Sequence, residues 1–163
     1  MADGRPRDLV ARISVGLALG GGCLVLVLAL LVTASVLRRW LTADSVPGDF
    51  ELVQNGLAIA VFAFLPICQL HGANITVDTF TRAGPAWVQA GLDGVWALAY
   101  GAVAGLIAWQ TAVGARETLA SGTTTMVLGL PIGWAMALSA VFAAWLVVVA
   151  IVTATRAWRG SAA

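Results

Sequence analysis

The sequence predicts an all-α integral membrane protein, a bundle of four transmembrane helices, and two observations lead to this prediction. First, four long stretches contain no charged residue: 13–36, 52–70, 94–115 and 126–155. Each is close to or longer than the roughly 20 apolar residues that a helix needs to cross a hydrocarbon core of about 30 Å. Second, hydrophobic residues make up 60% of the chain and charged residues only 10%, against about 25% charged residues in soluble domains. The runs are too long and too uniform for the alternating strands of about 10 residues that build a membrane barrel.

The first span is predicted at about 13–36. Basic residues precede it, as they do in a cleavable signal peptide, but the apolar core of a signal peptide is only about 7–15 residues long. This stretch is longer, and Arg38-Arg39 follows it in the manner of a flank that stops translocation. The sequence therefore predicts a permanent first helix.

Turn-forming residues separate the later spans. Pro47-Gly48 is a turn signal before the second span, and Gly84-Pro85 precedes the third, where proline suits the first turn of a helix. Pro131 falls within the first two turns expected for the fourth span. The remaining spans are predicted at about 50–70, 90–114 and 126–154, so that residues 1–163 form a single four-helix membrane domain.

The connector between the second and third spans is too polar to cross a membrane and too apolar to be a free loop. It contains Asn74 and, four positions apart, Asp78 and Arg82. An acid and a base at this spacing can pair on a helix. The sequence predicts a short segment that lies at the membrane surface.

The arginine residues indicate an orientation, because the chain contains no lysine. With the N-terminus in the cytoplasm, the inside segments carry more arginine than the outside segments, as the positive-inside rule favours. The predicted topology is therefore N-in and C-in, with Arg5, Arg7, Arg12, Arg82, Arg156 and Arg159 inside, against Arg38, Arg39 and Arg116 outside.

The residues that most enzymes and cofactor proteins require are missing. His71 is the only histidine, so a haem held by two histidines has no ligands. Cys23 and Cys68 lie in different spans without C-x-x-C spacing and are expected to be small apolar packing residues. No phosphate-binding loop, nucleophile elbow or zinc motif occurs, and a net charge of +1 argues against a nucleic-acid partner. We therefore predict no enzyme activity, no cofactor and no metal site.

Asp93 is the only acidic residue with a case for lying inside the membrane. The uncharged stretch after it, 94–115, is already about 33 Å long as a helix. Asp93 is therefore expected at the membrane boundary, where water can hydrate its carboxylate. The alternative is a buried acid that couples transport to a proton or a sodium ion, since acids deep in a membrane are costly and usually functional.

Small residues give packing signals that are not specific, because some of these spacings are expected by chance in a chain with 18 glycines. Three pairs of glycines have the Gly-x-x-x-Gly spacing that lets two helix backbones approach each other. They are Gly16 and Gly20 in the first span, Gly101 and Gly105 in the third, and Gly129 and Gly133 in the fourth.

Several short segments, taken in order, resemble one known family over nearly the whole chain. Together they are similar to the small membrane subunit of tripartite ATP-independent periplasmic (TRAP) transporters. The segments are Val-Leu-Arg-Arg at 36–39, Pro-Gly-Asp-Phe-Glu-Leu at 47–52, Asn-Ile-Thr-Val-Asp at 74–78, Gly-Thr-Thr-Thr at 122–125 and Leu-Gly-Leu-Pro at 128–131.

The resemblance implies a multi-pass protein of the bacterial cell inner membrane that acts as a scaffold. Its implied partners are a large multi-spanning permease subunit and a periplasmic substrate-binding protein, besides the membrane lipids. The large subunit would carry the substrate and sodium sites, and the binding protein would deliver an organic acid. The residues expected to have structural or partner-contact roles are Arg38, Glu51, Asn74, Asp78, Arg82 and Pro131.

Two other functions compete with the scaffold. An independent small ion-coupled transporter would need a buried coupling acid, for which Asp93 is the only candidate. An anchor subunit of a membrane enzyme would need cofactor ligands that the sequence does not supply.

Overall fold

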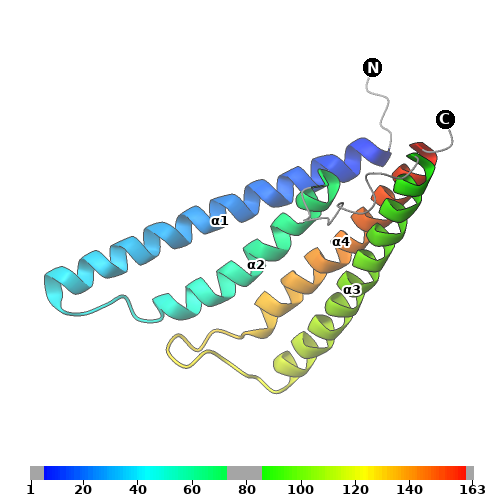
Figure 1. The fold of residues 1–163 in the computed structure, drawn as a ribbon. Helices are drawn as coiled ribbons and strands as arrows, with labels where there is room; N and C mark the ends of the chain where they lie inside the picture. Colours follow the sequence, from blue (N-terminus) through cyan, green and yellow to red (C-terminus); the bar gives the residue numbers. More distant parts are fainter. Residues whose placement is uncertain (1–5, 73–85, 161–163) are drawn as a thin grey trace.

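The computed structural model describes residues 6–72 and 86–160, which form four α-helices (Figure 1). All four are long and apolar enough to cross a membrane, and the described residues contain no strand. The prediction of an all-α four-helix membrane bundle is confirmed. The helices are α1 (Pro6–Thr42), α2 (Asp49–Leu70), α3 (Ala86–Ala120) and α4 (Gly133–Gly160).

The helices lie in a row in the spatial order α1, α2, α4, α3. Helix α2 packs against both α1 and α4, and α4 packs against α3 (Figure 1). Helix α4 is the most enclosed, since 33% of its most apolar stretch is buried, whereas only 11% of the corresponding stretch of α1 is buried. The row is therefore an open layer, and α1 is its most exposed member.

The start of α1 and the end of α4 lie at one end of the row, and the α1–α2 and α3–α4 connectors lie at the other (Figure 1). An even number of spans requires this arrangement in a membrane. The assignment of the chain ends to the cytoplasm remains a prediction from the arginine residues. The expected surface segment between α2 and α3 falls in 73–85, outside the described residues.

The helices differ from the predicted spans chiefly at their ends. Helix α1 has 37 residues, which corresponds to about 55 Å at 1.5 Å per residue and exceeds the hydrocarbon core of about 30 Å. Helix α4 begins at Gly133, so residues 126–132 lie in a loop and not in the first turns of a span. Gly129 adopts a left-handed φ of 65°, and Pro131 cannot donate a backbone hydrogen bond. The expected place of both residues inside the fourth helix was therefore wrong.

Glycine allows close packing between α3 and α4. A Cβ atom added to Gly101 would lie 3.0 Å from the Cβ of Ala150, and one added to Gly105 would lie 3.7 Å from Val147. The predicted packing role of this glycine pair is confirmed. Gly21 similarly faces α2, where an added Cβ would lie 3.1 Å from Ala63.

The glycine pair of α1 behaves differently. A Cβ atom added to Gly16 or to Gly20 would meet nothing within 4 Å. These residues therefore make no close contact with another helix in the described part of the chain, although their spacing is the same.

Hydrogen bonds between side chains of different helices include two that reach α4 from α1 and from α2. The indole N–H of Trp145 in α4 donates to the hydroxyl of Ser14 in α1 at 3.1 Å. The amide of Gln69 in α2 donates to the hydroxyl of Thr153 in α4 at 3.1 Å. Ser14 is fully buried and Gln69 is 8% exposed, so both bonds are shielded from solvent and fix the relative positions of the helices.

The two glycine environments give a matched test of packing. Gly101→Leu should separate α3 from α4 and destabilise the isolated protein by about 1–3 kcal/mol, the usual cost of overfilling a packed interface. Gly16→Leu adds the same side chain where no atom lies within 4 Å of the added Cβ, and it should leave stability almost unchanged. Thermal unfolding of the two variants in the same detergent measures the difference. Equal loss of stability in both variants would contradict the packing assignment.

Candidate functional site: the junction of the two connectors

A carboxylate at the start of α2 binds the backbone of the α3–α4 connector. Glu51 lies in the first turn of α2. Its Oε1 accepts a hydrogen bond from the N–H of Val127 at 2.8 Å, and its Oε2 accepts one from the N–H of Leu128 at 3.0 Å. Hydrogen bonds to an ionised acceptor are about twice as strong as those between neutral groups. Glu51 therefore ties together two segments that are far apart in the sequence.

Gly48 provides the space for this contact. It precedes α2 with a left-handed φ of 73°, a conformation that glycine adopts without strain. A Cβ atom at Gly48 would overlap the side chain of Leu128. The Pro-Gly sequence before α2 is thus required both for the turn and for the approach of the second connector.

The connector that Glu51 binds is a small hairpin, residues 123–132. Thr124 and Pro131 face each other as an antiparallel bridge. The N–H of Thr125 donates to the carbonyl of Leu130 at 2.9 Å, and the Thr125 hydroxyl accepts from the N–H of Leu130 at 3.0 Å. The left-handed Gly129 lets the chain reverse within this short distance.

The first connector is joined to the same junction. The hydroxyl of Ser35 in α1 donates to the carboxylate of Asp49, the first residue of α2, and accepts from the N–H of Val46 at 3.2 Å. Arg38 forms an ion pair of 2.8 Å with Asp44. Both side chains of that pair are exposed, so the pair contributes less than about 1 kcal/mol.

The structure brings three of the residues predicted from sequence to this end of the row. Glu51 makes the central contact, Pro131 belongs to the hairpin, and Arg38 lies in the first connector's ion pair. The other three, together with the expected pairing of Asp78 with Arg82, lie outside the described residues: Asn74, Asp78 and Arg82.

Sequence reasoning missed several residues of the junction. Asp49 follows the turn signal directly, and an acid at the start of a helix is a usual stabilising feature, so the sequence held a signal for it. Leu128 stood only within the Leu-Gly-Leu-Pro segment of the family resemblance. Ser35 carried no signal, because a hydroxyl inside an apolar stretch looks like any other packing residue.

The remaining candidates for chemistry lie apart from one another. Cys23 and Cys68 are free thiols. The ring Nδ1 of His71 lies 3.1 Å from the carbonyl oxygen of Ile67, at the end of α2. Asp93 is exposed on α3. No group of three or more potential metal ligands occurs within residues 6–72 and 86–160.

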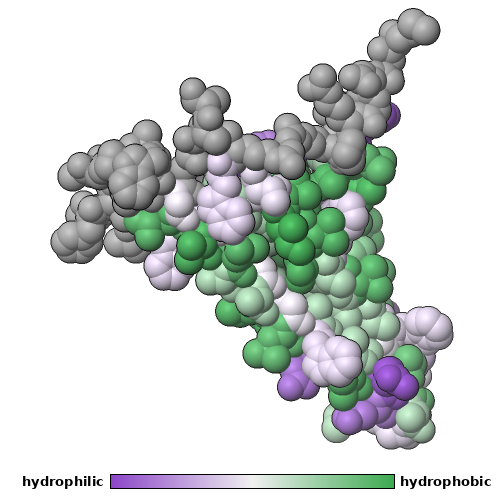
Figure 2. Space-filling view, turned by 90° about the vertical axis from the view of Figure 1, so that its right-hand side faces the viewer, coloured by the Kyte–Doolittle hydropathy of each residue, from purple (hydrophilic) through white to green (hydrophobic). Residues whose placement is uncertain are grey.

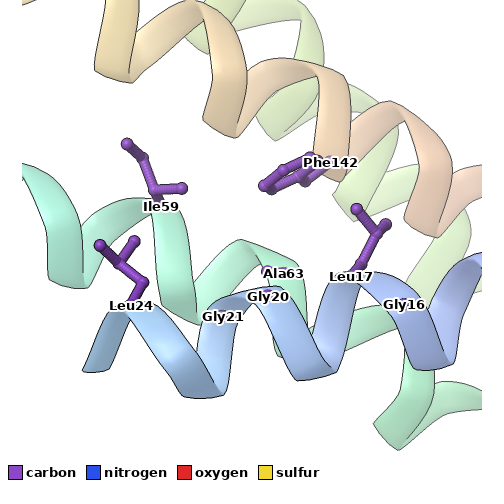
Figure 3. Close-up of a pocket in the computed structure, with 8 residues that line it drawn as sticks. All are labelled: Gly16, Leu17, Gly20, Gly21, Leu24, Ile59, Ala63 and Phe142. Carbon is purple, nitrogen blue, oxygen red and sulfur yellow. The ribbon is translucent and has the colours of Figure 1, made fainter. Parts of the chain in front are cut away.

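A groove opens between α1, α2 and α4 around the unpaired glycines of α1 (Figure 3). Its volume is about 240 Å³. Every residue along it is apolar, so it offers no group to hold an organic acid or an ion. The residues are Gly16, Leu17, Gly20, Gly21, Leu24, Ile59, Ala63 and Phe142.

The Glu51 contact can be tested by changing one oxygen. Glu51→Gln keeps the shape but leaves one amide N–H of the hairpin facing an N–H₂ group, so hydrogen exchange at 123–132 should become faster. Asp44→Asn is the matched control, because it removes the charge of an exposed pair that does not touch the hairpin. Hydrogen–deuterium exchange by mass spectrometry measures both variants. Unchanged hairpin exchange in Glu51→Gln would show that the contact does not hold the connector.

The junction falls within the part of the chain that matches a known protein family. The family is described as "Tripartite ATP-independent periplasmic transporters, DctQ component", and the match covers residues 28–160. No curated protein and no solved structure matches the chain. The family comprises components of a transporter and not enzymes. With four apolar helices and a match over most of its length, this multi-pass membrane protein belongs to the DctQ component family of TRAP transporters.

Proposed function

We propose that this chain is the small scaffold subunit of a TRAP-type secondary transporter. In this role it supports a large permease subunit in the sodium-driven uptake of an organic acid, which a periplasmic binding protein delivers. The observation that supports the proposal most directly is the family match over residues 28–160. The bacterial inner membrane, with both chain ends in the cytoplasm, is the proposed location.

The character of the spans also favours a scaffold. The stretches 13–36, 52–70, 94–115 and 126–155 contain no charged side chain, so nothing in them can bind a coupling ion by charge. The groove of Figure 3 is apolar throughout. Substrate and coupling ion are therefore assigned to the large subunit.

The surface of the row suits a membrane partner. Apolar side chains cover the middle of the face in Figure 2, and hydrophilic residues gather at its lower end, the level at which α3 ends in Figure 1. In a complex, the large subunit would cover part of this surface and lipid the rest. Helix α1 offers the largest exposed apolar area, including Leu9, Leu19, Leu26, Val27, Leu30 and Leu37.

The position of Asp93 does not favour an independent transporter. Its side chain is exposed on the surface of the row, and the neighbouring Gly94 packs beneath the indole of Trp158. A coupling acid is expected to face the interior of a bundle or a water-filled cavity. Its exposure supports the proposal that Asp93 lies at the membrane boundary.

The first test asks whether the chain transports by itself. In liposomes with a sodium gradient it should move no organic acid alone, and uptake should appear when the large subunit and the loaded binding protein are added. The substrate used is the acid that the purified binding protein binds, and accumulation of its radiolabelled form is the measurement. Sodium-driven uptake by this chain alone would exclude the scaffold function.

A second test concerns the charge of Asp93. Asp93→Asn should leave uptake by the complete transporter and the yield of complex within about twofold, because surface substitutions usually have small effects. Sodium-driven uptake and complex yield are measured side by side on the same preparations. Loss of uptake with normal assembly would assign Asp93 a coupling role.

A further inference from the structure

We propose that the 123–132 hairpin is a membrane-inserted element. Its apolar arm, residues 126–132, lies in the interfacial layer of the bilayer at the end of the row opposite to both chain ends, with phospholipid as its partner. The inference depends on the structure of the hairpin and on the membrane location, and it does not depend on the proposed transport function.

The side chains of the apolar arm point away from the protein. Met126 is 101% exposed, Val127 62% and Leu130 42%. Trp134, two residues after the hairpin, is also largely exposed, and tryptophan is enriched at membrane interfaces. A loop in water gains nothing from such a surface, whereas a loop in the interfacial layer is stabilised by it.

The backbone N–H groups of the apolar arm have hydrogen-bond acceptors within the protein and do not need water. Carbonyl groups of the hairpin accept from the N–H groups of Thr125, Gly129 and Ile132. The hydroxyl of Thr125 accepts from Leu130, and Pro131 has no N–H to satisfy. The carboxylate of Glu51 accepts from Val127 and Leu128 and also interacts with the amide of Met126.

This degree of internal pairing is the requirement for backbone in lipid, where no water is available to bond an exposed amide. A water-exposed loop has no such requirement, because solvent bonds its free amides. The hairpin therefore combines two independent features of a lipid-facing segment, an apolar surface and a satisfied backbone.

The lengths of the neighbouring helices put the hairpin at the edge of the hydrocarbon core. The uncharged stretch 52–70 of α2 is about 28 Å long and 133–155 of α4 is about 34 Å long, each close to a hydrocarbon core of about 30 Å. Both stretches thus reach the edge of the core where the hairpin meets α2 and α4. Helix α3 continues past this level to Ala120. The polar segment 121–125, called the polar arm, then leads the chain back to the level of the hairpin (Figure 1).

The chemistry of the arm favours lipid over a docking protein. The stretch 118–132 contains no charged residue, and the exposed side chains of the arm are aliphatic or a thioether. The carboxylate that touches the hairpin, that of Glu51, is occupied by hydrogen bonds from the hairpin amides. A surface of this kind lacks groups that would orient a protein partner, but it needs none to enter the acyl boundary.

The depth of the hairpin can be measured with a nitroxide spin label. In a background with Cys23→Ala and Cys68→Ala, a label is attached through Met126→Cys, and the protein is reconstituted in liposomes of phosphatidylethanolamine and phosphatidylglycerol. Power saturation compares the accessibility of the label to oxygen, which partitions into lipid, with its accessibility to a water-soluble nickel chelate. Ser121→Cys on the polar arm and Val148→Cys on the exposed side of α4 are the controls for water and for lipid.

The label at 126 should behave like the label at 148, with oxygen accessibility above nickel accessibility, and the label at 121 should show the reverse. Nickel accessibility at 126 equal to that at 121 would overturn the proposal, because the hairpin would then lie in water. Low accessibility to both reagents, either alone or with the large subunit bound, would also overturn it, because a protein surface would then cover the arm.

Adding Glu51→Gln to the Met126→Cys variant tests the role of the backbone bonds. If satisfied amides keep the arm in the lipid layer, the nickel accessibility of the label should rise when Glu51 loses its charge. Asp44→Asn in the same background should leave it unchanged. An unchanged label with Glu51→Gln, together with faster hydrogen exchange of the hairpin, would overturn the link between the carboxylate and the depth.

Discussion

The whole structure depends on one constraint, that backbone amides and carbonyls near lipid must find their partners within the chain. Four long helices meet it over most of the sequence. The α3–α4 connector meets it by another route, with Glu51 accepting the amides that the hairpin cannot pair for itself. A side chain at the start of one helix thereby completes the hydrogen bonding of a loop that precedes another.

Lipid removes the hydrophobic drive that holds soluble helices together, since apolar side chains gain little by exchanging lipid for protein. The row is held instead by close backbone approach at glycines and by a few shielded polar bonds. Gly101 brings α3 onto α4, Trp145 joins α4 to Ser14, and Gln69 joins α2 to Thr153. These few contacts fix the positions of the helices relative to one another. Most of the large apolar surface is not used for packing between the helices.

The sequence predicted the number of helices and their approximate positions, because charge-free length is a direct consequence of bilayer thickness. It failed at the start of α4, where the apolar residues 126–132 form a loop. An apolar stretch indicates that a segment lies near lipid. It does not distinguish a helix from another segment whose backbone groups are hydrogen-bonded within the chain. Glu51 was predicted as a structural residue, but its partners, Val127 and Leu128, could not be derived, because no local pattern connects residues so far apart in the chain.

An open row of helices also restricts what the chain can do alone. Alternating access in secondary transporters relies on a midplane site that two units enclose and expose in turn. The helices of the row pack in the order α1, α2, α4, α3, and the groove between α1, α2 and α4 is lined by apolar residues (Figure 3). The layer presents a broad apolar surface, and hydrogen bonds of Glu51 and Ser35 hold its connectors at one end. A layer of this kind is suited to extend the fixed part of a larger membrane protein, against which a moving part can work.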